Sequence, residues 1–369
     1  MKNLIYLLFS TFFIFSCNKE SIEKPNIILI VADDLGWTDL SYMGSKYYET
    51  PNIDNLSESG VTFFNGYASS ANCAPSRASM MTGKYHPSHG IYTVSPSARG
   101  LDITRKIIPT KNTENLDLEF FTMAEMLKTE GYINGHIGKW HLGTDPQGYD
   151  FWKVLPGQGT YYAPDFRTPD GLVEGTPGEY VTEAVVTQSI EWLEKERDQS
   201  KPFMLMVQHK APHRNWMPAL RHLSLYDDIE IPEPPTLFDE WKDNAPGARV
   251  QELEIDRHMD LNYDLFVDLT PEFNQPPSQK RQDRSAWQNM KRMTPEQLKV
   301  WRDHYRPRDE DFHKAQLKGK DLVRWKFQRY AKNYLRCVKG VDESIDRLQQ
   351  ELVKLGLDQN TIVIYSSDQ

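Results

Sequence analysis

The sequence predicts a layered α/β fold built on a large, mostly parallel sheet. Continuous apolar, β-branched runs stop abruptly at polar residues, as in "NIILIVADD" at 26–34, and such runs are typical of strands buried on both faces. Amphipathic helical patterns separate these runs, which favours helices packed on the faces of the sheet. The chain has 369 residues, 39% of them hydrophobic, so it can bury a core of this size.

Four further elements are predicted in the first half of the chain. Residues 50–60, "TPNIDNLSESG", predict a short helix with Pro51 in its first turn and a glycine past its end. Residues 61–68, "VTFFNGYA", predict a strand. The stretch 122–131, "TMAEMLKTEG", opens with a Thr-x-x-Glu capping box, and the predicted helix leads into a strand over 132–138.

The second half repeats the alternation of helix and strand. A helical pattern that ends near Leu193 precedes an apolar strand over 203–208. A long amphipathic helix around 322–355 precedes a last strand, "TIVIYSSDQ", at 361–369. Between these units, residues 219–320 are polar, contain prolines and are poorly periodic. We therefore predict that they form an excursion over the sheet edge or a lid.

The N-terminus predicts export. Residues 1–17 contain Lys2 and an apolar run too short to span a bilayer, followed by Ser16 and Cys17. The ending "IFSC" resembles a bacterial lipobox, in which Cys17 is lipidated and anchors the protein to the membrane, and 18–24 would then be a short tether. Ordinary signal cleavage is the alternative. We expect an exported protein in the periplasm or at the cell surface of a Gram-negative bacterium.

The charge balance argues against nucleic acid as a partner. The chain has 43 basic and 52 acidic residues, a formal net charge of −9. A phosphate backbone would be repelled by such a surface. Any anion that the protein binds must be held by a local group of residues.

Two cysteines remain once Cys17 is set aside. A disulfide between Cys73 and Cys337 is permitted in an exported chain. However, Cys337 lies beside the apolar stripe of the long C-terminal helix, which predicts a buried, unpaired side chain. Cys73 then needs another explanation.

Polar residues follow four of the predicted strands, and ligands of open α/β sheets bind at the carboxyl ends of strands. These residues are Asp33 and Asp34, Lys139 and His141, His209 and His213, and Asp368 and Gln369. The three aspartates and the glutamine offer only oxygen ligands if the amide faces inward, which suits Ca²⁺ or Mg²⁺ and not zinc. A single aspartate would more readily cap a helix, but two pairs on separate strands favour a metal site.

The two histidines after the 203–208 strand have the i, i+4 spacing of a zinc pair. That spacing places both on one side only in a helix, and Pro212 and the preceding strand exclude a helix there. His209 and His213 are better interpreted as loop histidines for proton transfer or anion binding, with a surface histidine as the alternative.

The stretch "NCAPSRASMMTG" places Cys73 at the start of a predicted helix. A phosphatase thiolate loop requires Cys-x5-Arg, but Ser79 occupies that place and Arg77 comes two residues earlier. Pro75 fits the first turn of a helix that runs to Gly83, so free backbone N–H groups and the helix dipole favour an anion near Cys73. The same position could lower the pKa of the thiol. The residues alone predict an anion-handling nucleophile.

The motif itself resembles a known family. "CAPSRASMMTG" matches the Cys-x-Pro-Ser-Arg-x4-Thr-Gly signature of the formylglycine-dependent sulfatases. The blocks "NIILIVADDLGWTDL", "TPNIDNLSESGVTF", "GHIGKWHLG" and "HKAPHRNW" resemble the family's other motifs in the expected order. The resemblance spans 25–369 and implies one catalytic domain with the alkaline-phosphatase-like α/β/α sandwich.

The resemblance implies a role for each residue near the motif. Cys73 would be oxidised to formylglycine by a maturation enzyme; one hydroxyl of the hydrated aldehyde attacks sulfur, and the other loses its proton when sulfate is expelled. Arg77 would hold those hydroxyls, and Lys139 would bind the sulfate. His141 would be the partner of the second hydroxyl, and His213 would contact the sulfate and the leaving oxygen.

The resemblance also implies the cofactor and the substrate class. The metal ligands for Ca²⁺ or Mg²⁺ would be Asp33, Asp34, Asp368, Gln369 and the side chain at Cys73. The sequence is similar to bacterial N-acetylglucosamine-6-sulfatases that desulfate host glycans, with algal polysaccharides such as ulvan as the alternative. His209, Tyr161 and Tyr162 are candidates for binding the carbohydrate, and core packing is the alternative for the two tyrosines.

Members of this family continue beyond the position of Gln369 into a segment with another active-site lysine and a smaller C-terminal domain. We therefore expect this chain to be C-terminally truncated and to lack that domain. Two alternatives to a working sulfatase follow: an inactive lipoprotein that binds sulfated glycans, and a phosphodiester or phosphonate hydrolase of the same superfamily.

Overall fold

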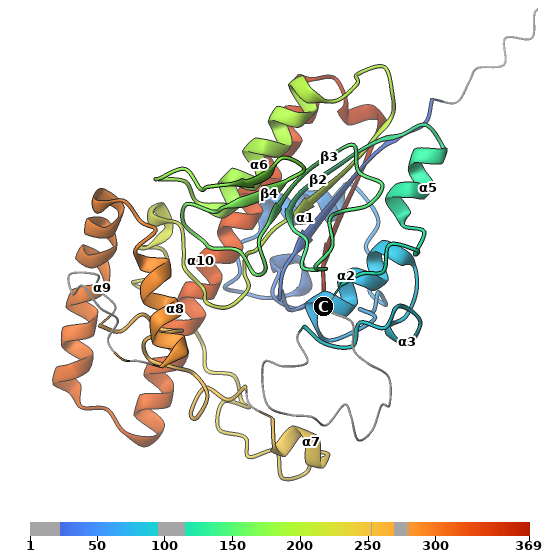
Figure 1. The fold of residues 1–369 in the computed structure, drawn as a ribbon. Coiled ribbons are helices and arrows are strands. Elements are labelled where there is room, and N and C mark those ends of the chain that lie inside the picture. The colour runs from blue at the N-terminus through green and yellow to red at the C-terminus, as the bar shows by residue number, and fades with distance from the viewer. Residues whose placement is uncertain (1–22, 95–114, 252, 269–277, 279) are drawn as a thin grey trace, which may run out of the picture.

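The computed structural model describes residues 23–94, 115–251, 253–268, 278 and 280–369 (Figure 1). The predicted export signal, Cys17 and most of the tether lie outside these residues and stay predictions. Within the part that is described, no helix combines the length and the apolar character needed to cross a membrane.

One seven-stranded sheet organises the fold, in the order β5-β4-β3-β2-β6-β1-β7. The strands are β1 (Asn26–Ala32), β2 (Ile133–Lys139), β3 (Phe151–Leu155), β4 (Phe166–Thr168), β5 (Gly171–Val173), β6 (Phe203–Gln208) and β7 (Thr361–Ser367). The five strands from β3 to β7 in that order are parallel, and β4 and β5 extend the sheet antiparallel beyond β3. The predicted mixed, mostly parallel sheet is confirmed.

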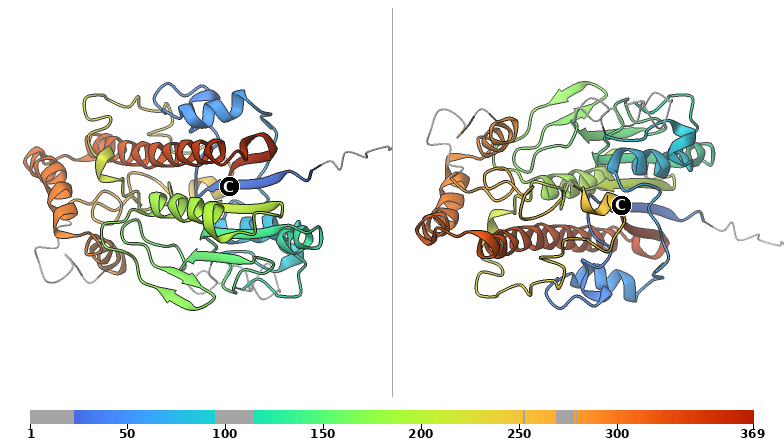
Figure 2. Two further views of the ribbon diagram at one scale, coloured as in Figure 1. Left: turned by 90° about the horizontal axis from the view of Figure 1, so that it is seen from above. Right: turned by 90° about the horizontal axis from the view of Figure 1, so that it is seen from below.

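Helices cover both faces of this sheet (Figures 1 and 2). They are α1 (Pro51–Glu58), α2 (Cys73–Thr82), α3 (His86–His89), α5 (Met123–Thr129), α6 (Val181–Glu191), α7 (Pro246–Arg249), α8 (Arg281–Met290), α9 (Pro295–Ala315) and α10 (Gly319–Lys354), with short helical turns η1 (Ser41–Met43), η2 (Trp192–Glu196), η3 (Leu220–His222) and η4 (Asp358–Asn360). Successive side chains of a strand point to opposite faces. Leu205 of β6 therefore joins the core under α6 and α10, whereas Met204 joins the core under α2 and α5. The molecule is an α/β/α sandwich, as predicted.

Most elements in the first half match their predictions. The predicted helix at 50–60 is α1, and the Thr122 hydroxyl accepts from the backbone N–H of Glu125 at 3.2 Å, so the capping box is confirmed. The strand predicted at 61–68 is wrong. Both sides of β1 are taken by β6 and β7, no described strand pairs with this segment, and Phe63 is 82% exposed.

The segment 219–320 contains more helix than its sequence suggested, because α8 and α9 lie within it beside α10 (Figure 1). Charged residues dominate α9 and hide its apolar pattern. Two aromatic residues one turn apart, Trp301 and Tyr305, nevertheless pack one face of α9 into the core. Their exposed fractions are 1% and 2%. The prediction of poor periodicity is wrong for this part, whereas a lid function stays a prediction.

Candidate active site

The register of the parallel strands brings the predicted site together at one edge of the sheet. Ala32 of β1 pairs with Ser367 of β7, and Val31 pairs with Gln208 of β6. The residues that follow each strand are therefore neighbours. Accordingly, the backbone N–H of Asp368 donates to the carbonyl of Ala32 at 3.1 Å. Residues far apart in sequence share one site because their strands end at the same level.

Two carboxylates and two cations form the buried centre of this site. The ammonium group of Lys139 contacts Asp33 Oδ2. Arg77 Nη2 lies 2.9 Å from Asp368 Oδ2 and 3.7 Å from Asp33 Oδ1. None of the four side chains is more than 2% exposed. Buried charges of this kind depend on one another, because removal of one leaves its partner without compensation in a region of low polarity.

The position of Arg77 is fixed from several sides. It lies on α2, and its Nη1 group donates to the carbonyl of Lys139 at 3.0 Å and to Gln208 Oε1 at 2.8 Å. Gly138 permits this close packing, since its φ is +106° and a Cβ there would lie 1.9 Å from the carbonyl oxygen of Gln208. The guanidinium group is thus held rigidly beside the first turn of α2.

Cys73 is the first residue of α2, as predicted, and follows an extended Asn72. The residue is 4% exposed. Burial raises the pKa of Cys73 to about 11; Lys139 opposes this rise, and the nearby carboxylates, Asp33 first, add to it. The pKa of this thiol is therefore raised and not lowered as the helix N-terminus suggested, because burial and the neighbouring carboxylates disfavour the thiolate. Cys337 is fully buried and neither cysteine is in a disulfide, as predicted.

The site has a group of side chains that fits a hard cation. Asp33, Asp34, Cys73 and His213 each offer one ligand atom, and these atoms lie within 4.8 Å of one another. Burial raises the pKa of Asp34 to about 7, and repulsion by Asp33 adds to the rise. The oxygens Asp33 Oδ1 and Gln369 Oε1 are buried without a hydrogen-bond partner. A divalent cation would satisfy such oxygens and relieve the repulsion, so the residues present fit Ca²⁺ or Mg²⁺.

Two of the predicted metal ligands differ from expectation in their orientation. Asp368 has both oxygens engaged, Oδ1 by the N–H of Asp34 at 3.1 Å and Oδ2 by Arg77. The amide nitrogen of Gln369, and not its oxygen, contacts Asp34 Oδ1. Ligation by Gln369 would require the amide to turn over, which exchanges its N and O positions. The ligand-like group in this structure therefore contains His213 and does not contain Asp368.

Two predicted histidines lie in the field of the buried cations. His213 Nε2 is 3.4 Å from Asp34 Oδ2, and burial, followed by Lys139 and Lys210, holds the pKa of His213 well below its usual range. Burial lowers the pKa of His141 to about 3, and Lys139 contributes next. Both imidazoles are neutral at neutral pH, so each has a nitrogen that can accept a proton. Asp34 and His141 also have positive φ, 61° and 59°, which is uncommon outside glycine and often marks functional sites.

Three predicted carbohydrate-binding residues are not presented to the site. His209 is 1% exposed, and its Nε2 atom is 3.0 Å from Ser344 Oγ on α10, on the far side of the sheet from Arg77. The hydroxyl groups of Tyr161 and Tyr162 donate to the backbone carbonyls of His213 and Pro218, both at 2.6 Å. The two tyrosines are at most 2% exposed. Core packing, and not sugar stacking, describes them.

Lys210 is a site residue that the sequence did not single out. It directly follows β6, is 3% exposed, and its Nζ lies 4.9 Å from the ring centre of Tyr161. Burial lowers the pKa of Lys210 to about 8, with Lys139 adding to the fall and Asp33 opposing it. Its place between two histidines at a strand end was the available signal. A lysine in a loop is usually solvated, so that signal was weak.

The fold and the site define an α/β protein that gathers a helix N-terminus, buried cations and an oxygen-rich cation site at the carboxyl ends of parallel strands. The chain belongs to the sulfatase family, to which residues 25–369 match.

Relatives support this assignment over nearly the whole chain. An N-acetylglucosamine-6-O-sulfatase of Bacteroides thetaiotaomicron is 38% identical over 354 residues, which is 95% of this chain and 59% of that protein. An N-acetylgalactosamine-6-O-sulfatase of the same organism is 43% identical over 131 residues, 36% of this chain and 23% of that protein.

Solved structures agree with the fold. One structure, of a complex with its substrate D-glucosamine-2-N,6-O-disulfate, aligns with a TM-score of 0.83 and 36% identity over 94% of this chain and 66% of that chain. A structure in complex with a neocarrahexaose aligns with a TM-score of 0.59 at 21% identity over 94% of this chain and 58% of that one, and shows the fold alone. The match thus spans about three fifths of the N-acetylglucosamine-6-O-sulfatase and about two thirds of the chain in the disulfate complex.

Proposed function

We propose that this chain is the catalytic part of a sulfatase that hydrolyses sulfate esters of sulfated carbohydrates and uses a formylglycine formed from Cys73. The observation that carries the proposal is the position of Cys73, at the first residue of α2 and among the ligand atoms of Asp33, Asp34 and His213. A thiol whose pKa is raised to about 11 is a poor nucleophile at neutral pH. Conversion of this side chain explains why a cysteine stands there.

In this proposal, the negatively and positively charged residues around Cys73 have different roles. Asp33, Asp34 and, after an amide turn, Gln369 would hold a Ca²⁺ or Mg²⁺ ion, which supplies positive charge against the oxygens of a sulfuryl group. Formylglycine, when present, supplies a hydroxyl nucleophile in place of the thiol. Arg77 and Lys139 are fixed and buried, so they stabilise negative charge without rearrangement.

The histidines and Lys210 complete the proposed site. His213 is neutral and next to Asp34, so it can exchange a proton with the leaving oxygen. His141 is neutral as well and can accept a proton from the group at residue 73. Lys210 adds a third cation at the same sheet edge, which favours an anionic substrate.

The similarity to the B. thetaiotaomicron enzyme and to the disulfate complex supports a sulfated amino sugar as the substrate. We propose a 6-sulfated N-acetylglucosamine residue in preference to a 6-sulfated galactosamine, because the glucosamine relative matches 95% of this chain and the galactosamine relative 36%.

The test is co-production of the chain with a formylglycine-generating enzyme. Mass spectrometry of the peptide that contains residue 73 should show the aldehyde in place of the thiol. A protein that joins this chain to the C-terminal part of a close relative should release sulfate from N-acetylglucosamine 6-sulfate once residue 73 is converted, and its Cys73→Ala variant should not.

Three results would redirect the proposal. Unconverted Cys73 in every preparation would remove the formylglycine mechanism. Binding of the sulfated sugar without release of sulfate, despite conversion, would favour a glycan-binding protein. Faster hydrolysis of a phosphodiester or phosphonate ester than of the sulfate ester would favour the other hydrolase class.

We also propose export and lipidation at Cys17, on the basis of Lys2, the apolar run and the "IFSC" ending. Labelling of the protein with a radioactive fatty acid in a bacterial host should require Cys17. Equal labelling of wild-type protein and Cys17→Ala would contradict the proposal, and a cleaved but unlabelled protein would indicate ordinary signal cleavage.

A further inference from the structure

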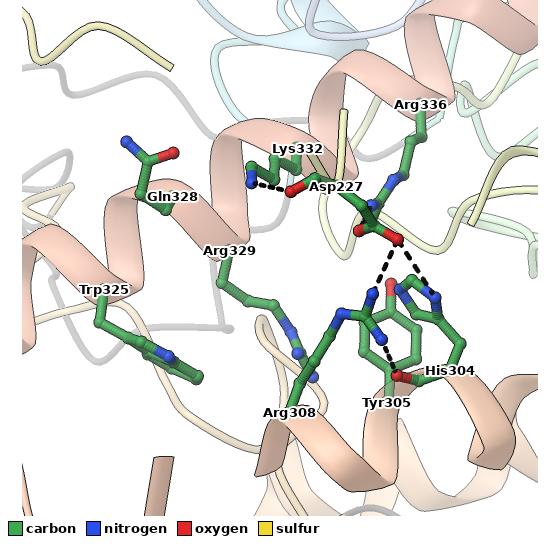
Figure 3. A pocket seen from close by; sticks show the side chains of 9 residues that line it. All are labelled: Asp227, His304, Tyr305, Arg308, Trp325, Gln328, Arg329, Lys332 and Arg336. Carbon is green, nitrogen blue, oxygen red and sulfur yellow. Dashed lines mark hydrogen bonds and ion pairs between the residues drawn. The ribbon is translucent and has the colours of Figure 1, made fainter. Parts of the chain in front are cut away.

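A charged cavity lies away from the strand-end residues of the sheet, between α9 and α10 (Figure 3). It has a volume of about 170 Å³. The cationic side chains that line it are Arg308, Arg329, Lys332 and Arg336, and the single carboxylate of its lining is Asp227. We call this cavity the α9–α10 pocket.

Asp227 is shared among the cations of the pocket. Its Oδ2 atom lies 2.7 Å from Arg308 Nη2, and its Oδ1 atom lies 2.9 Å from Arg336 Nη2. Lys332 reaches only the backbone carbonyl of Asp227, at 3.4 Å. One carboxylate thus serves two arginines and leaves Lys332 without a direct ion pair among the described residues.

Carboxylates outside the lining do not remove this excess. Asp309 Oδ1 pairs with Arg329 Nη2 at 2.9 Å. Burial, followed by repulsion from Arg336, lowers the pKa of Lys332, although the charges of Asp227 and Glu230 oppose this fall. Four cations therefore face two carboxylates that form ion pairs with them, Asp227 and Asp309, and a third, Glu230, for which no ion pair with them occurs among the described residues.

The contacts of His304 also indicate an excess of positive charge in the pocket. Its Nδ1 atom is 3.9 Å from Asp227 Oδ2, which is too long for a hydrogen bond. Its Nε2 atom is buried without a partner, and the side chain is 10% exposed. Burial lowers the pKa of His304 to about 3, and Arg308, Arg336 and Arg329 lower it further. A polar ring atom therefore lies in a positive region with nothing to bind.

A purely structural role for these charges explains part of the arrangement. Arg336 and Arg308 join α10 and α9 through Asp227, and such pairs can hold helices together. That role does not require a cavity or a buried nitrogen without a partner, both of which packed structures usually avoid. An anion in the cavity would give the ammonium group of Lys332 a charged partner, which the 3.4 Å contact to the carbonyl of Asp227 does not supply.

We propose that the α9–α10 pocket binds a tetrahedral oxyanion, sulfate or phosphate, either free or as a substituent on a sugar. Arginine donors suit such oxygens because a planar guanidinium can give two parallel hydrogen bonds. The cavity is smaller than the pockets of about 300 Å³ and more that hold whole drug-sized ligands, so it suits one small group. This site is separate from the catalytic cluster and does not depend on catalysis there.

The experiment measures sulfate binding by calorimetry and thermal shift, at constant ionic strength with chloride as the balancing anion. Lys332→Gln and Arg308→Gln should each weaken sulfate affinity about tenfold, because each removes a charge-assisted hydrogen bond. Arg324→Gln is the matched control. It removes an arginine from the same helix, but Arg324 is 45% exposed and pairs with Glu233 outside the pocket.

Three arms separate the sources of the anion: inorganic sulfate, inorganic phosphate and a sulfated disaccharide. If only the disaccharide binds in a Lys332-dependent way, the pocket is a carbohydrate subsite; if the inorganic ions bind equally well, it is a free-anion site. Either result supports the proposal. Wild-type affinity in both pocket variants, or an equal loss in all three variants, would overturn it.

A second measurement locates the anion. In histidine-labelled protein, sulfate should raise the pKa of His304, because a bound anion stabilises the imidazolium. The signal of His304 is the one that is absent from the spectrum of His304→Gln. If sulfate does not shift that signal in wild-type protein, the proposal is overturned. Sulfate-ester hydrolysis by Lys332→Gln and Arg324→Gln should equal that of wild-type protein, so failure of the proposed enzymatic function would be seen separately.

Discussion

The strand-end cluster around Asp33 and the α9–α10 pocket differ in the sign of the charge that they leave uncompensated. In the cluster, one carboxylate oxygen (Asp33 Oδ1) and one amide oxygen (Gln369 Oε1) are buried without hydrogen-bond partners, which favours a cation. In the pocket, cations outnumber carboxylates and leave His304 Nε2 without a partner, which favours an anion. The two sites also differ in burial. Asp33 and Lys139 are fully buried, whereas Arg308 and Asp227 are 40% and 22% exposed.

This difference follows from the elements that supply the side chains. The cluster is built from strand ends whose register fixes the backbone, so short aspartates suffice to meet each other. The pocket is built from helix faces, where Arg329, Lys332 and Arg336 recur at three- and four-residue spacing and reach inward on long side chains. Changes in the cluster should therefore have larger effects on stability than changes in the pocket.

The largest effect is expected for Asp33→Asn. It leaves Lys139 buried without its ion-pair partner, whereas Arg77 keeps Asp368 at 2.9 Å, and loss of one partner of a buried pair costs about 3–5 kcal/mol. Urea unfolding should show this loss in the free energy of unfolding. Asp34→Asn is the control. Because the pKa of Asp34 is already raised to about 7, its removal in metal-free protein should be neutral or stabilising, and equal losses in the two variants would contradict the distinction.

The strand-end cluster was largely predictable, because the polar residues follow apolar runs and parallel strands end together. Asp33, Asp34, Arg77, Lys139, His141 and His213 were all identified in this way or through the family motif. The orientations of Asp368 and Gln369 were not, because hydrogen bonds to Arg77 and Asp34 decide them, and those contacts come from other elements.

The α9–α10 pocket could not be predicted for a related reason. A lysine or arginine on an amphipathic helix usually lies in solvent, and sequence spacing does not reveal which helix will pack against that face. The wrong strand at 61–68 and the missed α9 have the same origin. The apolar residues at 61–68 are exposed because no described strand pairs with them. The aromatic residues of α9 pack against residues outside that helix, such as Phe266.

Removal of divalent cations should lower stability through the strand-end cluster and not through the α9–α10 pocket. Chelation should lower the melting temperature, since a cation at about one hundred times its dissociation constant contributes about 2.7 kcal/mol. Ca²⁺ or Mg²⁺ should restore the melting temperature in wild-type protein and in Lys332→Gln, but less in Asp34→Asn. Identical melting before and after exhaustive chelation would show that the cluster holds no cation.

A smaller effect on stability is expected from protonation of buried histidines beside arginines. Two such histidines are His136 near the cluster and His304 in the pocket, and the prediction here concerns His136. Burial lowers the pKa of His136 to about 3, so the unfolded state, with a histidine pKa near 6.5, binds more protons between these values. Stability should therefore fall as pH decreases below 6.5, and His136 should account for about 2 kcal/mol of that fall at pH 5. His136→Gln should show a shallower pH dependence of the unfolding free energy than wild-type protein.

The control for the pH experiment is His313→Gln, which changes an exposed histidine on α9. Loss of its exposed contact with Asp268 should change the free energy of unfolding by no more than about 0–1 kcal/mol, which is less than the change expected for His136→Gln. Should His136→Gln keep the full dependence, the acid sensitivity must come from other groups, and the assignment of a neutral His136 would be wrong.

The smallest effect on the free energy of unfolding is expected for Arg308→Gln. This variant tests whether charges in the pocket contribute less to stability than charges in the cluster. Arg308 is 40% exposed, and Asp227 keeps Arg336 as a partner at 2.9 Å when Arg308 is lost. Partly exposed ion pairs contribute about 0–1 kcal/mol, so the free energy of unfolding should change by no more than that in the absence of sulfate. Added sulfate should then stabilise wild-type protein more than the variant, because the variant has lost a donor to the anion but not its fold. A loss of several kcal/mol without sulfate would mean that the pocket charges hold the helices together as strongly as the cluster charges hold the strands, and the contrast between the two sites would fail.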